Sequence, residues 1–436
     1  MKIIEKHSSY DIAPADPELF TTAVVQGYSR SVAHVFKFES FEFQLLRWLS
    51  QTTYSGAEIG ECLSTAHLIK DGDIESWLAE WRALAERVEQ IGHDCLARGH
   101  RVSAREAFLR ATTYYEASFF YAPDDDPRKL ELYRRQRDAF RAAGALLDHP
   151  FEVVRIPYEG GKTLPGYFLA ADDSGRPRPT IMINTGGDGT AERMYFSGGA
   201  AAGLRRGYNV LLWEGPGQIG AYLEDRSLVF RPDWEVPAGA ALNYLDTRDD
   251  VDRDRIGYIG FSMGGYFVPR TAGHDQRLAA GVALTLTPES WPSMPQVMKM
   301  KEEWFINPPA EDELGPQTRY ALKEMMPRFG YTGGISDLPA WGEYLKLFSC
   351  AGLEEKTTCP ILAISTTGEG KLFFDNAKGY FDGLPNPDNR FVLTTEDDGA
   401  EMHCVRGNSS LAHQIIFDWL DEVLARPAHR ALTSTA

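Results

Sequence analysis

The sequence has few cysteines: the 436 residues include five, at Cys62, Cys95, Cys350, Cys359 and Cys404. Their number is odd, and no pair has the close spacing of a zinc finger or a redox motif. This pattern argues against a disulfide framework and against a cysteine-ligated metal site. It predicts free thiols in a reducing compartment.

Basic residues are also in deficit, with 45 Lys and Arg against 62 Asp and Glu, which gives a net charge of −17. Nucleic acids and anionic membranes are polyanions, so an acidic chain is an unfavourable partner for both. No stretch approaches the ~20 apolar residues that span a bilayer. The N-terminus lacks an apolar run followed by a cleavage site, so we expect a cytoplasmic protein.

A chain of 436 residues is too long for one compact core, and its composition changes near residue 150. Residues 1–149 place apolar side chains at helical spacing, for example Trp77, Trp81, Leu84 and Val88. We therefore predict an N-terminal helical domain, with helices throughout its length.

Residues 150–436 contain short β-rich runs, most of the later ones separated by helical stretches. Such alternation predicts a mostly parallel, doubly wound α/β sheet with helices on both faces. The alternation stops at about 288–352, where Trp, Pro, Met and charged residues are frequent. That segment is predicted to be a helical insertion between two strands of this second domain.

The strongest motif for chemistry is Gly260-Phe261-Ser262-Met263-Gly264-Gly265. A bare G-x-S-x-G occurs often by chance, but here an apolar strand-like run precedes it and a helical run follows. Strand, sharp turn and helix are what a nucleophile elbow requires. Ser262 is therefore the predicted nucleophile.

The base and the acid should follow in the order Ser, acid, His. Among the later histidines, His403 lies in the loop after the last predicted strand, where it can reach a nucleophile, so it is the predicted base. Glu369 lies in the turn just after the strand 360–365 and is the favoured acid. Asp375, at the start of the next helix, remains the alternative.

One oxyanion donor is expected from the backbone N–H of Met263, the residue after the nucleophile. A second should come from the glycine-rich loop 185–190, with Gly187 or Asp188 as the candidate. The Asp188 side chain has two possible roles. It can cap the helix expected near Gly189, or it can be held protonated beside the substrate as an acid.

Five segments in order, GGDGTAERMYF, GPGQ, GFSMGG, the GEG turn and GAEMHC, resemble a group of α/β-hydrolases. This group includes a pseudooxynicotine hydrolase and the fungal pigment hydrolases that shorten polyketide chains. The resemblance implies the α/β-hydrolase fold over about 150–425, N-terminal helices that cover the active site, and in some members a homodimer. It supports Ser262, His403 and Glu369, although the acid of the family is often Asp, and it places an acidic residue at position 188.

Members of this group hydrolyse carbon–carbon bonds next to a ketone, so the leading hypothesis is a C–C hydrolase of a polyketide-like small molecule. Alternatives are an esterase, thioesterase or acyl peptidase, an acyltransferase or cyclase, and a non-catalytic binding protein. No cofactor and no metal are expected, because the sequence has no phosphate-binding glycine loop and no ligand cluster.

Overall fold

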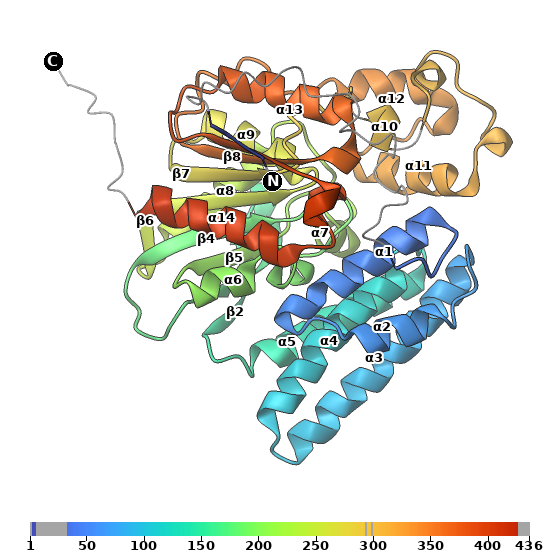
Figure 1. Ribbon diagram of the computed structural model, residues 1–436, viewed down its shortest axis with the longest axis vertical. Coiled ribbons are helices and arrows are strands. Elements are labelled where there is room, and N and C mark those ends of the chain that lie inside the picture. Colours follow the sequence, from blue (N-terminus) through green and yellow to red (C-terminus); the bar gives the residue numbers. More distant parts are fainter. Residues whose placement is uncertain (1, 6–32, 293, 298–299, 426–436) are drawn as a thin grey trace.

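The computed structural model describes residues 2–5, 33–292, 294–297 and 300–425, and its centre is one large sheet (Figure 1). Nine strands pair in the order β1-β9-β8-β7-β6-β4-β5-β3-β2. The strands are β1 (Lys2–Glu5), β2 (Phe151–Pro157), β3 (Thr163–Leu169), β4 (Arg178–Asn184), β5 (Asn209–Trp213), β6 (Val251–Phe261), β7 (Leu278–Leu284), β8 (Ile361–Thr366) and β9 (Arg390–Thr394).

The strands from β4 to β9 are all parallel to their neighbours within that group. The hairpin of β2 and β3 joins β5 in antiparallel orientation. Parallel strands end at a common edge, so the loops after β4, β6, β8 and β9 gather there. The prediction of a mostly parallel α/β sheet is confirmed.

Helices cover both faces of the sheet (Figure 1). Successive strand residues point to opposite faces, and apolar side chains on both faces need to be buried. Met182 of β4 packs into one core, while its neighbours Ile181 and Ile183 pack into the other. The helices of this part of the chain are α6 (Ala200–Arg205), α7 (Ile219–Glu224), α8 (Glu235–Asp246), α9 (Gly264–His274), α13 (Lys371–Gly383) and α14 (Ser409–Leu424).

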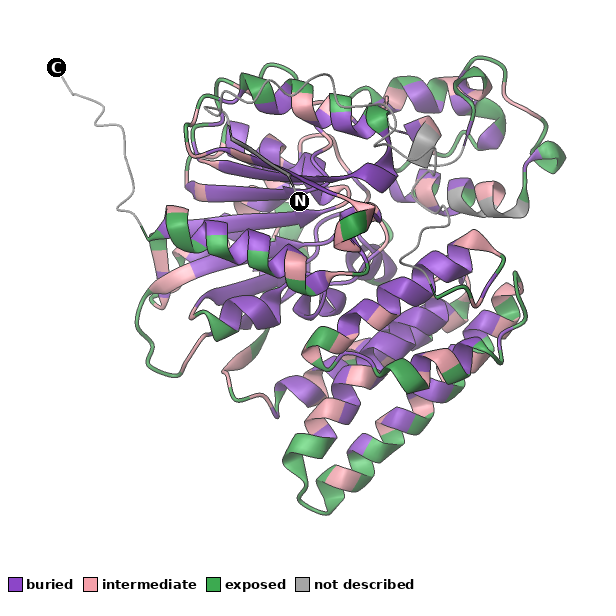
Figure 2. Cartoon of the chain, in the orientation of Figure 1, coloured by how far each residue is buried: buried purple, intermediate pink, exposed green. Residues whose placement is uncertain are grey.

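In the described part of the chain, five α-helices precede β2 and share a hydrophobic core, to which Ile219 and Leu223 of α7 also contribute. They are α1 (Glu39–Leu49), α2 (Ile59–Ala66), α3 (Ile74–Ala97), α4 (Arg101–Phe119) and α5 (Pro127–Gly144). The face of α3 predicted from the sequence is buried, with Trp77, Trp81 and Val88 inaccessible to solvent. Figure 2 shows this banding, with buried and exposed residues on opposite sides of α3.

The prediction that the N-terminal region is helical throughout is wrong at its start. Residues Lys2–Glu5 form β1, which pairs antiparallel with β9 at the edge of the sheet. Four residues are too few for a helical period, and the two β-branched isoleucines suit an edge strand. The strand β1 therefore lies beside β9, the last strand of the chain in this sheet.

Between β7 and β8 the chain leaves the sheet and forms the insertion, drawn in orange in Figure 1. It contains α10 (Met294–Val297), α11 (Pro316–Arg328) and α12 (Leu338–Leu345). Trp341 of α12 is fully buried, and its ring packs 5.2 Å from that of Phe329. This contact holds the end of α11 against α12.

Candidate active site

Ser262 occupies a sharp turn between β6 and α9. Its φ of +58° lies in the left-handed region, which is strained for a residue with a side chain. Two glycines make the turn possible. A Cβ on Gly260 would lie 2.3 Å from the Gly264 carbonyl oxygen, and one on Gly265 would lie 1.6 Å from the Thr285 carbonyl oxygen.

A chain of hydrogen bonds runs from Ser262 through His403 to Glu369. His403 follows β9, and its Nε2 lies 2.9 Å from the Ser262 Oγ. Its Nδ1 lies 2.5 Å from the Oε1 of Glu369, which follows β8 and is fully buried. With Nδ1–H donating to the carboxylate, Nε2 is left to accept the serine proton.

The structure brings Glu369, rather than Asp375, to the imidazole. Asp375 lies on the exposed side of α13, where it forms an ion pair with Lys371 at 2.5 Å. Thr285 donates a hydrogen bond from its Oγ1 to the Glu369 carboxylate. Thr285 was not identified from the sequence, because nothing local marks it as a partner of Glu369.

The environment of His403 favours its charged form. Burial lowers the pKa of His403, but the neighbouring Cys404 and Glu369 both raise it, and the pKa lies above its ordinary value. The Cys404 thiol is itself buried, and the charge of His403 helps to lower its pKa against the effect of burial. The imidazolium that would form when Ser262 loses its proton is therefore stabilised.

The loop after β4 closely approaches Ser262. A Cβ on Gly186 would lie 2.6 Å from the Ser262 Cβ and 2.9 Å from the Met263 nitrogen. Among the described residues, neither the Met263 N–H nor the Gly187 N–H donates a hydrogen bond to the protein. Both predicted oxyanion donors are therefore available to a ligand.

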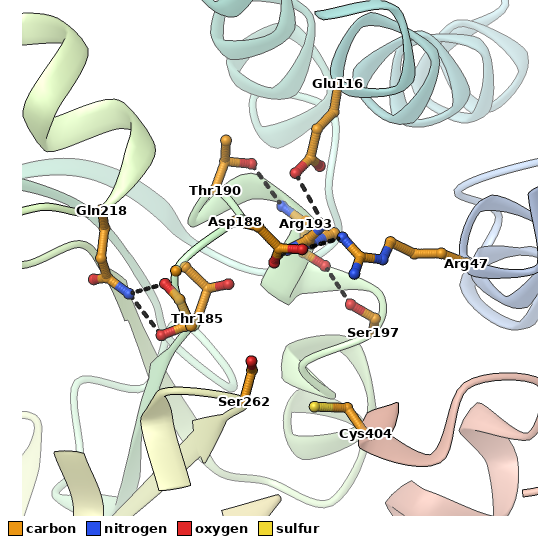
Figure 3. A network of polar contacts seen from close by, with 12 residues as sticks. Arg47, Glu116, Thr185, Asp188, Thr190, Arg193, Ser197, Gln218, Ser262 and Cys404 are labelled. Carbon is orange, nitrogen blue, oxygen red and sulfur yellow. Dashed lines mark hydrogen bonds and ion pairs between the residues drawn. The ribbon is translucent and has the colours of Figure 1, made fainter. Parts of the chain in front are cut away.

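Gln218, which ends the GPGQ turn, supports this loop from within the fold. Its side-chain amide donates to the carbonyls of Thr185 and Gly186, at 2.6 and 3.1 Å (Figure 3). The same side chain bonds Asn184 at the end of β4. The sequence identified the turn only as structural, and the structure gives it the specific task of holding the loop.

Two arginines bind the Asp188 side chain, and this environment favours its ionised form over the protonated acid considered above (Figure 3). Its Oδ2 accepts from the Arg47 Nη1 at 2.9 Å, and its Oδ1 lies 3.2 Å from the Arg193 Nη2. Desolvation raises the pKa of this carboxylate, but the charges of Arg47 and Arg193 outweigh that effect, and the pKa lies well below its usual range. Asp188 is thus ionised and holds no transferable proton.

Arg193 continues the network to the N-terminal helices. It is buried and lies 3.4 Å from the Glu116 carboxylate on α4. Burial raises the pKa of Glu116 to about 7, although Arg193 and Arg47 oppose the rise. Glu116, Arg193, Asp188 and Arg47 thus form one network of charged side chains beside the serine.

Ser262 and His403 open into a cavity of about 260 Å³. The N-terminal helices, the insertion and the sheet edge each contribute to its wall. Its apolar and aromatic lining side chains are Phe43, Phe120, Tyr121, Ile219, Phe230, Met263, Tyr266, Met294, Met325, Phe329 and Phe373. A concave apolar wall with a few polar groups is typical of small-molecule sites.

The tryptophans of the insertion are not part of this wall. Met294 lines the cavity, but Trp291, Trp304, Phe305 and Trp341 pack within the insertion instead. Aromatic content alone does not tell which side of a segment faces a ligand.

Further findings concern the described part of the chain. All five cysteines are free thiols. No cluster of three or more histidine, cysteine or carboxylate side chains there is arranged to hold a metal ion. In the same residues, no helix combines the length and the apolar character that crossing a membrane needs.

Comparison with known proteins identifies relatives along most of the chain, although no family model matches it. It is 32% identical over 422 residues to Hydrolase ORFZ of Pyricularia oryzae, covering 89% of this chain and 97% of the relative. It is 32% identical over 424 residues to the 20-hydroxy-prefusarin hydrolase FUS2 of Gibberella moniliformis, covering 90% and 98%. It is 33% identical over 434 residues to the alpha/beta hydrolase psoB of Aspergillus fumigatus, covering 90% and 95%.

Solved structures show the same fold. The crystal structure of 2,6-dihydroxy-pseudo-oxynicotine hydrolase superposes with a TM-score of 0.66 at 20% identity, covering 86% of this chain and 95% of that chain. The protein AbyA5 superposes with a TM-score of 0.59 at 16% identity, covering 86% and 96%.

Proposed function

This chain is a hydrolase of the α/β-hydrolase family, and we propose that it is a serine hydrolase of an apolar, carbonyl-bearing small molecule. The observation that carries the proposal is the hydrogen-bonded chain of Ser262, His403 and Glu369 at the wall of an apolar cavity. Ser262 is the nucleophile, His403 the base, and Glu369 the acid that orients the imidazole.

In the first half of the reaction, the Ser262 Oγ bonds to the substrate carbonyl carbon while His403 Nε2 takes the hydroxyl proton. The N–H group of Met263 and that of Gly187 or Asp188 bind the oxyanion of the tetrahedral intermediate. The bond to the leaving group then breaks, and His403 returns its proton to that group. In the second half, water attacks the acyl-enzyme through the same steps and releases a carboxylic acid.

For the bond, we propose a carbon–carbon bond of a β-dicarbonyl compound, as the family resemblance implies. The leaving group is then an enolate that a second carbonyl stabilises. The ionised Asp188 cannot protonate it, so the proton comes from His403. The positive charge of Arg47 and Arg193 near the site favours such an anion.

Ester or thioester hydrolysis is the second candidate, and the ionised state of Asp188 favours it. Without an additional acid beside Ser262, leaving groups that need little protonation react most easily. An activated aryl ester and a β-diketone of similar size should therefore be compared on the same enzyme.

The proposal is tested by labelling with a fluorophosphonate probe and by mass spectrometry of products formed in ¹⁸O-water. We expect label on Ser262 and one ¹⁸O atom in the carboxylic acid product. Labelled enzyme that forms an ester or ring without ¹⁸O would be an acyltransferase or cyclase. Absence of both label and turnover in folded protein would indicate a binding protein.

The partners that we propose are a small-molecule substrate and a second copy of this chain. The net charge of −17 disfavours nucleic acid as a partner, and the cavity beside Ser262 supports a small-molecule substrate. The family resemblance supports a homodimer, which light scattering after size-exclusion chromatography would test. A monomeric mass at micromolar concentration would contradict it.

A further inference from the structure

The last residue of α11, Arg328, connects the insertion to the loop beside Ser262. Its Nη1 donates a hydrogen bond to the carbonyl oxygen of Gly187, and its Nε lies 2.9 Å from the Asp124 Oδ2. The side chain is 10% exposed and lines the cavity. The Arg328 guanidinium therefore contacts two parts of the chain at the same time. They are Asp124 of the N-terminal domain and the loop 185–190, which we call the oxyanion loop.

The contact with the Gly187 carbonyl constrains the next N–H group. The described residues contain no cis peptide bond, and in a trans peptide the C=O and the following N–H point in opposite directions. Arg328 therefore sets the direction of the Asp188 N–H, as Gln218 sets that of the Gly187 N–H through the Gly186 carbonyl. Among the described residues, nothing accepts a hydrogen bond from the Asp188 N–H.

The other end of Arg328 is held by a buried cluster on the N-terminal helices. Asp124 precedes α5, and its carboxylate also pairs with the buried Lys129 at 2.7 Å. The Asp124 backbone N–H donates to Glu324 of α11 at 2.6 Å, and its carbonyl accepts from Arg226. Burial raises the pKa of Asp124, but Arg328 and Lys129 outweigh that effect and lower it, so its charge persists beside Arg328.

We propose that the Asp188 N–H is a donor of the oxyanion hole and that Arg328, from the insertion, is the positioning residue that orients it. The hole then has its working geometry only when the insertion is seated against the N-terminal helices. The cover of the cavity thereby takes part in catalysis as well as enclosing the substrate. This inference rests on the proposed serine hydrolase function, because it assigns Arg328 to the oxyanion of that reaction.

The inference predicts a specific kinetic change. A misplaced oxyanion donor weakens the transition state and barely affects the ground state, and removal of a whole donor typically costs roughly 10²–10³ in kcat. Arg328→Met leaves the Asp188 N–H present and removes the hydrogen bond to the Gly187 carbonyl that orients it. We expect it to lower kcat by roughly 10–100-fold while KM changes by less than about threefold.

The control is Arg226→Met, which removes a hydrogen bond from the same Asp124 cluster and does not touch the oxyanion loop. It should keep kcat within about twofold of the unmodified enzyme, since no oxyanion donor is disturbed. Arg328→Lys provides a second test if Arg328→Met does not fold. Lysine keeps the charge near Asp124 but lacks the planar fork that reaches both partners, so kcat should again fall.

The measurements are kcat and KM for an aryl ester, and the affinity for an alkyl boronic acid, whose adduct with Ser262 places an oxygen in the hole. Both Arg328 variants should bind the boronic acid more weakly by the factor that kcat loses. Equal effects of the Arg226 and Arg328 variants, or a change in KM alone, would overturn the inference. If the unmodified enzyme neither turns over ester nor reacts with a fluorophosphonate at Ser262, the proposed function fails instead.

Discussion

Arg47 of α1 and Asp188 of the oxyanion loop are 141 residues apart in the chain, and their side chains form an ion pair at 2.9 Å. The Arg47 side chain is 3% exposed and the Asp188 side chain 44% exposed, so this contact joins the N-terminal helices to the sheet edge at the wall of the cavity. Figure 3 shows the guanidinium reaching across to Asp188, with Arg193 on the same carboxylate. The pair decides the ionisation state of a residue beside the nucleophile.

The first prediction follows from the ionised state of Asp188. Because Asp188 is ionised, Asp188→Asn removes a charge and an anchor for two arginines but no transferable proton. We expect it to slow hydrolysis of a β-diketone and of an activated aryl ester by similar factors, roughly tenfold each. Turnover of both substrates by one preparation measures this. A loss of roughly 10²-fold for the β-diketone alone would restore Asp188 as a general acid.

The second prediction concerns the three residues in the hydrogen-bonded chain. Ser262→Ala and His403→Ala should each lower kcat by roughly 10³-fold or more, with unchanged circular dichroism. Asp375→Ala is the matched control for the acid, because its carboxylate pairs with Lys371 on the surface. It should retain full activity, whereas Glu369→Ala should not. Near-normal turnover by folded Ser262→Ala would remove the covalent mechanism.

The third prediction is the pH dependence of kcat/KM. His403 must be neutral to accept the serine proton, so activity should fall as the pH drops through its pKa. The raised pKa places this inflection above the ordinary histidine value of about 6.5. Cys404→Ala and Glu369→Gln each remove a group that raises the pKa, so each should move the inflection to lower pH. An inflection that neither variant moves would assign the titration to another group.

The fourth prediction compares alanine substitutions at two neighbouring glycines of the elbow, Gly264 and Gly265. Gly265→Ala places a methyl group 1.6 Å from the Thr285 carbonyl oxygen, so the backbone must shift, at a cost of about 3 kcal/mol or more. At Gly264 the nearest atom to a Cβ is 3.5 Å away, so Gly264→Ala should keep the free energy of unfolding within about 1 kcal/mol. Urea unfolding of both variants measures the difference. Equal midpoints would show that the elbow tolerates both.

Much of the catalytic arrangement follows from local rules. The strand, turn and helix around Ser262 depend on residues 256–274, whose apolar pattern and glycines are visible in the sequence. His403 and Glu369 each follow a strand of one parallel sheet, so they emerge at the same edge as Ser262. The sequence by itself therefore determined the sheet apart from β1, its insertion and the neighbourhood of these three residues.

The choice between Glu369 and Asp375 depended on the tertiary structure. The two carboxylates lie close together in one turn and the helix that follows it, and the sequence pattern does not show which of them points toward His403. The charge of Asp188 was also beyond the sequence, since it comes from Arg47, which packing brings from a distant helix. Arg328 is a similar case, as its partners Asp124 and Gly187 lie in two other parts of the chain. Local patterns set which elements form, whereas ionisation and hydrogen bonding depend on which elements meet, and only the folded chain determines that.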